Sequence, residues 1–146
     1  MKTIKIFVFL LSFSGMIKGQ NSPIDKLFDK YAYQDGFTTV YISKYMFSLF
    51  ANKDMKENES DEFAKAINGL ESIRILVMDS TDKKINFFTE IGKDLPMNLY
   101  SPLMIVKEKD QELRMLIREK EGKIVEFLMI GGGEENLLIC ITGKLT

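Results

Sequence analysis

Residues 103–142 read LMIVKEKDQELRMLIREKEGKIVEFLMIGGGEENLLICIT, and they give the clearest indication of the fold. It holds four runs of mostly apolar and β-branched residues, at 103–109, 112–119, 123–130 and 137–142. Such runs are typical of β-strands. The breaks between them, at 110–111, 120–122 and 131–136, are short, and short connections join antiparallel neighbours. The stretch therefore predicts a four-stranded antiparallel meander.

Upstream of the meander, the sequence predicts helices interrupted by two strands. The strands are expected at 37–43 and 73–79, which are rich in β-branched and apolar residues. The helices are expected where apolar residues recur at helical spacing. They carry, in order, Ile24, Leu27, Phe28 and Tyr31; Met46, Phe47 and Phe50; Phe63, Ile67 and Leu70; and Ile85, Phe88, Ile91 and Leu95. This order predicts an α+β fold, with a mixed or antiparallel sheet and helices mainly on one face. It leaves the pairing of the first two strands open.

The first twenty residues, MKTIKIFVFLLSFSGMIKGQ, have the layout of a secretory signal peptide. Lys2 and Lys5 precede an apolar run at 6–13, and small residues follow it. Cleavage after Gly19 divides the chain into a signal peptide, 1–19, and a single domain, 20–146; cleavage after Gly15 is the alternative. No cysteine near this point offers a lipid attachment site. We therefore expect a periplasmic or secreted protein without a membrane anchor.

The composition argues against several classes of function. The chain has no histidine and one cysteine, so a Ser-His-Asp triad, an imidazole metal ligand and an internal disulfide are excluded. Removal of residues 1–19 takes three lysines from the 20 basic residues and leaves all 21 acidic ones, for a net charge near −4. A mildly acidic chain does not favour a nucleic-acid partner.

Four motifs resemble reactive or binding sites, and each has a simpler structural interpretation. Ser80–Lys83 matches S-x-x-K, but the further motifs of penicillin-binding enzymes are absent, which favours a helix-capping turn. The glycines at 131–133 fit a hairpin turn better than a phosphate loop. Cys140 lies between isoleucines, as a buried thiol would. The acidic stretch at 54–62 lacks the spacing of a calcium loop. We expect no catalytic residue, cofactor site or metal site.

Several segments resemble a secreted Bacteroidota family known as domain of unknown function 4252. They are KLFDKY at 26–31, GFTTVYISKYMF at 36–47, LESIRIL at 70–76, LRMLIRE at 113–119, KIVEFLMIGG at 123–132 and ICITG at 139–143. The resemblance implies a small α+β domain in a Gram-negative cell envelope. Members look to be encoded near extracytoplasmic-function sigma factors, which hints at envelope signalling. The resemblance implies no enzymatic activity and no site residues for this chain. If the chain comes from a member of the Bacteroidota, as the resemblance implies, Asp79-Ser80-Thr81 fits the O-glycosylation pattern of that group. The sequence leaves open whether Ser80 is modified.

The hairpin of the second and third meander strands gives a candidate partner surface. A two-residue turn at Glu121-Gly122 would bring Lys120 opposite Lys123 and divide the strands into two faces. One face, expected in the core, holds Leu113, Met115, Ile117, Ile124, Leu128 and Ile130. The other face holds Arg114, Leu116, Arg118, Val125, Phe127 and Met129, and it is too apolar for a solvent face. Either a protein partner covers it, or the N-terminal helix does so through Leu27, Phe28 and Tyr31.

Together these features favour an exported, non-catalytic binding or accessory domain that contacts a protein partner in the bacterial envelope. The alternative is a carrier of an apolar small molecule, held between the helices and the sheet. A third hypothesis is a histidine-free enzyme that uses carboxylates, serine or lysine. The sequence leaves the oligomeric state open.

Overall fold

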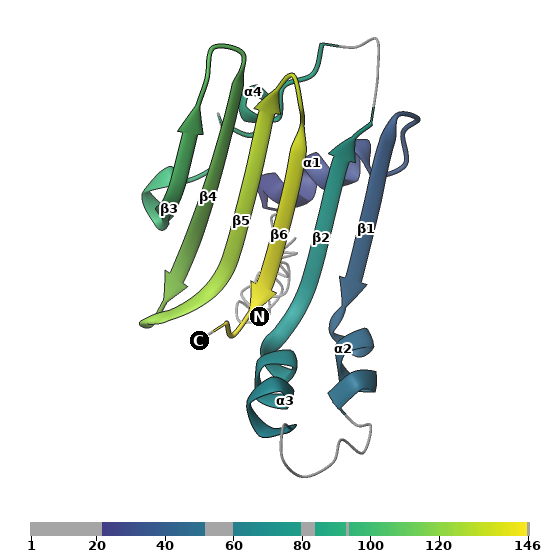
Figure 1. Ribbon diagram of the computed structural model, residues 1–146, viewed down its shortest axis with the longest axis vertical. Coiled ribbons are helices and arrows are strands. Elements are labelled where there is room, and N and C mark those ends of the chain that lie inside the picture. The colour runs from purple at the N-terminus through teal and green to yellow at the C-terminus, as the bar shows by residue number, and fades with distance from the viewer. Residues whose placement is uncertain (1–21, 52–59, 80–83, 93, 146) are drawn as a thin grey trace, which may run out of the picture.

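A computed structural model describes residues 22–51, 60–79, 84–92 and 94–145 of the chain (Figure 1). The predicted signal peptide, residues 54–59 of the acidic stretch at 54–62, and the Ser80–Lys83 motif lie outside these residues. The helices are α1 (Pro23–Tyr31), α2 (Lys44–Ala51), α3 (Ser60–Gly69), α4 (Phe87–Ile91) and the 3-10 turn η1 (Met97–Leu99). The strands are β1 (Phe37–Ser43), β2 (Leu70–Met78), β3 (Tyr100–Lys107), β4 (Gln111–Lys120), β5 (Lys123–Gly133) and β6 (Leu137–Gly143).

The strands form one six-stranded sheet in the order β1-β2-β6-β5-β4-β3. Every neighbouring pair is antiparallel. The chain is therefore of the α+β class, as its pattern of elements predicted. Strand β6 inserts between β2 and β5, so the first two strands join the sheet through β2. The residue pattern had left this pairing open.

Helix α1 begins where its sequence provides a complete cap. The Ser22 Oγ accepts a hydrogen bond from the Asp25 N–H at 3.1 Å, and the Asp25 carboxylate accepts one from the Ser22 N–H at 3.3 Å. This reciprocal pair satisfies backbone N–H groups that the start of a helix leaves without partners. Pro23, in the first turn, has no N–H group that would need a partner. The predicted helix and its buried face are confirmed, because Ile24, Leu27, Phe28 and Tyr31 are all buried.

The core lies between these helices and one face of the sheet. Figure 1 shows α1 and α4 behind the sheet. Three sheet leucines, Leu76, Leu128 and Leu138, expose 0% of their surface there. The rings of Tyr31 and Phe87 stack at 5.9 Å between centroids, and those of Tyr31 and Phe37 at 4.8 Å. This aromatic group joins α1, α4 and β1, and its burial stabilises the fold by about 2–3 kcal/mol for each well-buried ring.

The three glycines at 131–133 belong to strand β5, so their prediction as a hairpin turn is wrong. They allow α4 to approach the strand. A Cβ atom on Gly132 would lie 2.6 Å from the Asn86 Oδ1 and 2.7 Å from the Phe88 ring. The chain instead reverses at 134–136, where the buried Asn136 amide accepts a hydrogen bond from the Phe87 N–H at 2.8 Å and donates one to the Ile85 carbonyl at 2.9 Å. Close helix packing, rather than turn geometry, therefore explains Gly132.

Several element boundaries differ from the sequence prediction, among them the starts of α4 and β3. Helix α4 begins after Asn86, whose side chain accepts hydrogen bonds from the N–H groups of Phe88 and Thr89 at 2.9 and 3.2 Å. Ile85 therefore precedes the helix, because an N-cap residue sets the first turn. Strand β3 begins at Tyr100, three residues before the predicted start, and pairs there with Arg118.

Candidate functional site

The face of the sheet turned away from α1 and α4 is apolar across all six strands. Antiparallel pairing defines three rows of side chains on it, each crossing the whole sheet. In order from β1 and β2 through β6, β5 and β4 to β3, they are Thr38, Val77, Leu137, Gly131, Leu113 and Val106; Val40, Ile75, Ile139, Met129, Met115 and Met104; and Ile42, Ile73, Ile141, Phe127, Ile117 and Ser101. We call these rows the open face. They contain no charged residue.

The open face is the side of the sheet toward the viewer in Figure 1, where none of the drawn helices covers it. Its side chains in the central strands β2, β6, β5 and β4 are half-buried by their own neighbours, apart from the buried Gly131. Exposure rises at the edges, to 38% at Val40, 40% at Met104 and 41% at Val106. In proteins generally, large contiguous apolar surfaces are typical of interaction sites.

The predicted partner surface does not form a single face, because strand β5 contains a bulge. Lys120 pairs with Lys123 as expected, but Arg118 pairs with Glu126, so Val125 has no opposite residue on β4. The extra residue shifts every later pair by one position. Because successive side chains point to opposite faces, each later β5 side chain then lies on the same face as a different set of β4 side chains than the two-residue turn alone predicts. Since paired residues share a face, the six residues proposed from sequence are divided between the two sides of the sheet.

The structure places Phe127 and Met129 on the open face, opposite Ile117 and Met115. Leu116 instead lies on the helix-covered face with 2% exposure, and Arg114 and Arg118 flank it. The prediction that Leu113, Met115 and Ile117 form the core is therefore wrong, whereas Leu128 and Ile130 are buried as expected. Coverage of Phe127 by the N-terminal helix is also wrong, because α1 packs on the other side of the sheet.

The helix-covered face carries a polar cluster beside the apolar core. The Glu126 carboxylate, with 7% residue exposure, accepts a hydrogen bond from the Tyr100 hydroxyl at 2.5 Å and lies 3.1 Å from the Arg118 guanidinium. Burial, and then the hydrogen bond to Glu126, raises the pKa of Tyr100 above its ordinary value. Arg74 forms an ion pair with Asp25 of α1 and joins the helix to the sheet. These groups satisfy one another, which suits a structural role.

The charged members of this cluster line a partly open cavity of about 470 Å³ near the start of α1; they are Asp25, Arg74, Arg118 and Glu126. Cys140 also lines it, with only 4% exposure, so the prediction of a buried thiol is confirmed. Burial, followed by the charge of Glu126, raises the pKa of Cys140 to about 12. A thiol with so high a pKa is a poor nucleophile at neutral pH. Within the described residues, no cluster of acidic or cysteine side chains has the arrangement of a metal site.

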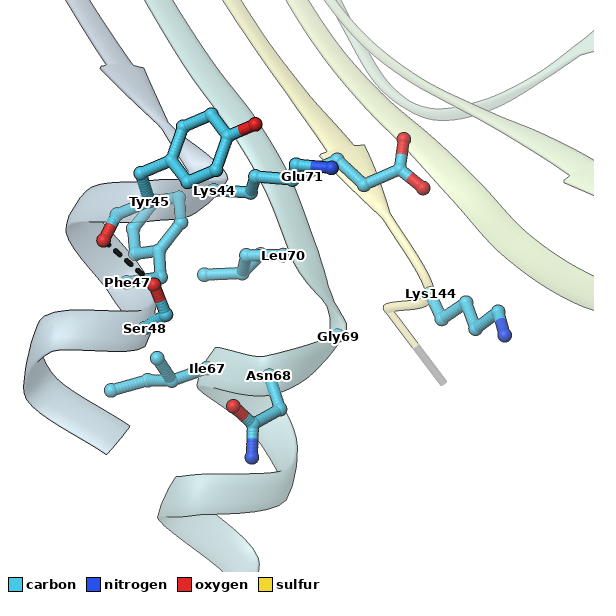
Figure 2. Close-up of a pocket in the computed structure, with 10 residues that line it drawn as sticks. All are labelled: Lys44, Tyr45, Phe47, Ser48, Ile67, Asn68, Gly69, Leu70, Glu71 and Lys144. Atoms are coloured by element: carbon cyan, nitrogen blue, oxygen red, sulfur yellow. Dashed lines mark hydrogen bonds between the residues drawn. The ribbon is translucent and has the colours of Figure 1, made fainter. Parts of the chain in front are cut away.

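A second cavity, of about 460 Å³, lies between α2 and α3 at one end of the sheet (Figure 2). Phe47, Ile67 and Leu70 form its apolar wall, and Lys44, Glu71 and Lys144 lie at its charged rim. The Ser48 hydroxyl donates a hydrogen bond to the Tyr45 carbonyl at 2.8 Å. The outer side of α2 is apolar and exposed, with Leu49 at 65% and Phe50 at 51%. The volume of this cavity lies within the range of small-molecule sites in proteins.

The chain belongs to the family described as Domain of unknown function (DUF4252), whose model matches residues 31–146. The match covers the sheet and the helices that follow α1. Among curated proteins and among solved structures, no match was found. No helix in the described part of the chain has the length and apolar character needed to cross a membrane.

Proposed function

We propose that this protein is an exported, non-catalytic binding domain of the bacterial cell envelope, and that it contacts a protein partner through the open face. One observation carries the proposal: the open face is apolar over six strands, and none of the described helices covers it. Interfaces between proteins are depleted in charged residues at their centre and enriched in aromatic residues and methionine. Met115, Met129 and Phe127 give the centre of the open face this composition.

Export and a role in envelope signalling are parts of the same proposal. The signal-peptide pattern at 1–19 supports export, and the family resemblance supports an envelope location. N-terminal mass analysis of the protein from envelope fractions tests this directly. The expected terminus is Gln20, without a lipid; a retained Met1 would contradict export.

Methionine oxidation tests whether a partner covers the open face. Met115 and Met129 lie on that face, whereas Met46 of α2 and Met97 of η1 lie elsewhere with 48% and 40% exposure. A mild oxidant converts accessible methionine to its sulfoxide, which mass spectrometry detects. We expect Met115 and Met129 to be oxidised more slowly in intact envelopes than in dilute purified protein.

Met46 and Met97 are the internal controls and should be oxidised at similar rates in both samples. Equal rates for the face methionines in both samples would contradict the proposal, because an occupied surface excludes the oxidant.

The second cavity favours one alternative function, the carriage of an apolar small molecule. Its volume of about 460 Å³ falls within the range of ligand sites, and Phe47, Ile67 and Leu70 supply an apolar wall. Native mass spectrometry of the purified protein would detect a bound molecule. Under this alternative, Ile67→Lys would remove the additional mass, whereas Tyr33→Lys, at a position 97% exposed outside the cavity, would not.

A further inference from the structure

We infer that the partner of the open face is a second copy of this chain, and that two copies pack face to face as a β-sandwich dimer. The inference rests on the proposed function, because it names the partner of the same surface. Two sheets of a sandwich pack about 10 Å apart with their inner side chains interdigitated. In this dimer the open faces would form that inner layer, and α1 and α4 would remain on the outside.

The area of the open face is sufficient for such a contact. Six strands about 4.8 Å apart, with five residues of about 3.3 Å along each strand, cover about 29 Å by 17 Å. This gives about 500 Å² on one copy and about 1,000 Å² over two copies, the size at which specific interfaces begin. A partner much smaller than a sheet would leave part of this apolar surface in water.

The chemistry of the open face makes it complementary to itself. A two-fold dimer places the same patch on both sides of the interface, so any charge in the patch would meet its own copy nearby. The three rows contain no charge, and their only polar side chains, Thr38 and Ser101, lie on the edge strands. Two copies can therefore approach without like-charge repulsion. A second copy also presents a surface of matching width and twist.

The centre of the face lies between the central strands β5 and β6, where Met129 pairs with Ile139. A two-fold axis near this pair would place the methionines of both copies at the middle of the interface. Met115 and Met104 continue the same row toward the edge. Methionine is flexible and fills irregular gaps, which suits the meeting of two twisted sheets.

The test combines molecular mass with a cross-linker on the open face. Sedimentation of the purified chain over a wide range of concentrations should reveal a dimer. Phe127→Glu places a charge opposite the partner sheet, so the dissociation constant should rise by at least about a hundredfold. Tyr33→Glu is the matched control, since Tyr33 is 97% exposed outside the open face, and this variant should remain dimeric.

A photo-reactive benzoyl-phenylalanine at position 127 provides a readout that does not require a destabilising substitution. In envelopes it should form a cross-link whose mass and peptides belong to two copies of this chain, and the same group at position 33 should not. If the chain is a monomer at every concentration and position 127 cross-links to a different protein, then the partner is not a second copy of this chain. The proposed function, contact with a protein partner through the open face, would still hold.

Two further outcomes also decide the inference. A cross-link to lipid, or a monomer with no cross-link and unprotected face methionines, would overturn both the dimer and the proposed function. A Phe127→Glu variant that is folded by circular dichroism and remains dimeric would overturn the open face as the contact between copies.

Discussion

Cys140 is the residue whose environment most directly predicts its behaviour. It exposes 4% of its surface, and burial raises its pKa to about 12. Reaction with a thiol reagent requires both access and the thiolate. We therefore expect slow labelling in the native protein and rapid labelling in denaturant, measured by mass. Cys140→Ser should cost about 1–3 kcal/mol, because it buries a hydroxyl without an assured partner. Rapid labelling of native protein would contradict the burial of β6.

The raised pKa values of Cys140 and Tyr100 predict a loss of stability in alkali. The ordinary pKa of Cys140 is 9.0, and in the folded chain it is about 12. Above pH 9 the unfolded chain loses this proton while the folded chain keeps it, so the unfolded state gains stability. The contribution is complete below pH 9 and is lost as the pH rises through about 12. Denaturant midpoints measured across this window should fall.

Cys140→Ala is the control for the alkaline effect. This variant lacks the thiol, so its stability should fall less steeply than that of the wild type over the same pH range. Tyr100, whose pKa is also raised, should account for part of the decline that remains. Identical slopes in the two proteins would show that Cys140 titrates at its ordinary value.

At the scale of elements, the packing of α4 on β5 depends on one glycine. A Cβ atom on Gly132 would meet the Asn86 Oδ1 at 2.6 Å and the Phe88 N–H at 3.0 Å, which are closer than normal contacts. Gly132→Ala should therefore displace α4 and cost about 1–3 kcal/mol in chemical unfolding. Gly131→Ala is the matched control, because its Cβ would meet its nearest neighbours at an ordinary 3.6 Å. Equal stability of the two variants would contradict the packing.

Edge strand β3 predicts a tendency to aggregate. It is the last strand of the sheet, and Leu103, Ile105 and Val106 are 59%, 53% and 41% exposed. An apolar edge offers free backbone groups to other chains. Ile105→Lys should reduce aggregation on heating, measured by light scattering, and change the free energy of unfolding by less than about 0.5 kcal/mol. Unchanged aggregation would indicate that β3 is not the exposed edge in solution.

Local pattern predicted most elements because their signals are short-range. The spacing of Ile24, Leu27, Phe28 and Tyr31 is sufficient to define α1 and its buried side. The bulge at Val125 has no such signal, since a valine fits a regular strand equally well. Its position depends on how β5 pairs with both neighbours, and this one residue changed which side chains share a face. The sequence therefore predicted the hairpin of β4 and β5 but not which of its side chains share a face.

At the level of the whole molecule, the sequence predicts only part of the open face. Strands with one solvent face alternate between apolar and polar residues, but β2 and β6 carry apolar residues on both sides, as in Ile75 and Ile139 on the open face and Leu76 and Leu138 on the helix-covered face. This pattern is typical of strands covered on both faces. The described helices cover only one face, and the pattern of the chain alone does not identify what would cover the other. Apolar residues on both sides of a strand were the available signal.

If two copies cover each other's open face, the thermal stability of the protein must depend on its concentration. Unfolding then separates the copies. By mass action, each tenfold rise in protein concentration raises the free energy needed to unfold and separate one dimer by about 1.4 kcal/mol. We expect the melting temperature of the wild type to rise with concentration in calorimetry. Phe127→Glu should melt at one temperature throughout, because its copies are already apart, whereas Tyr33→Glu should follow the wild type. A wild-type midpoint independent of concentration would mean that the sheet is stable without a second copy, and that the apolar rows around Met129 face a different partner.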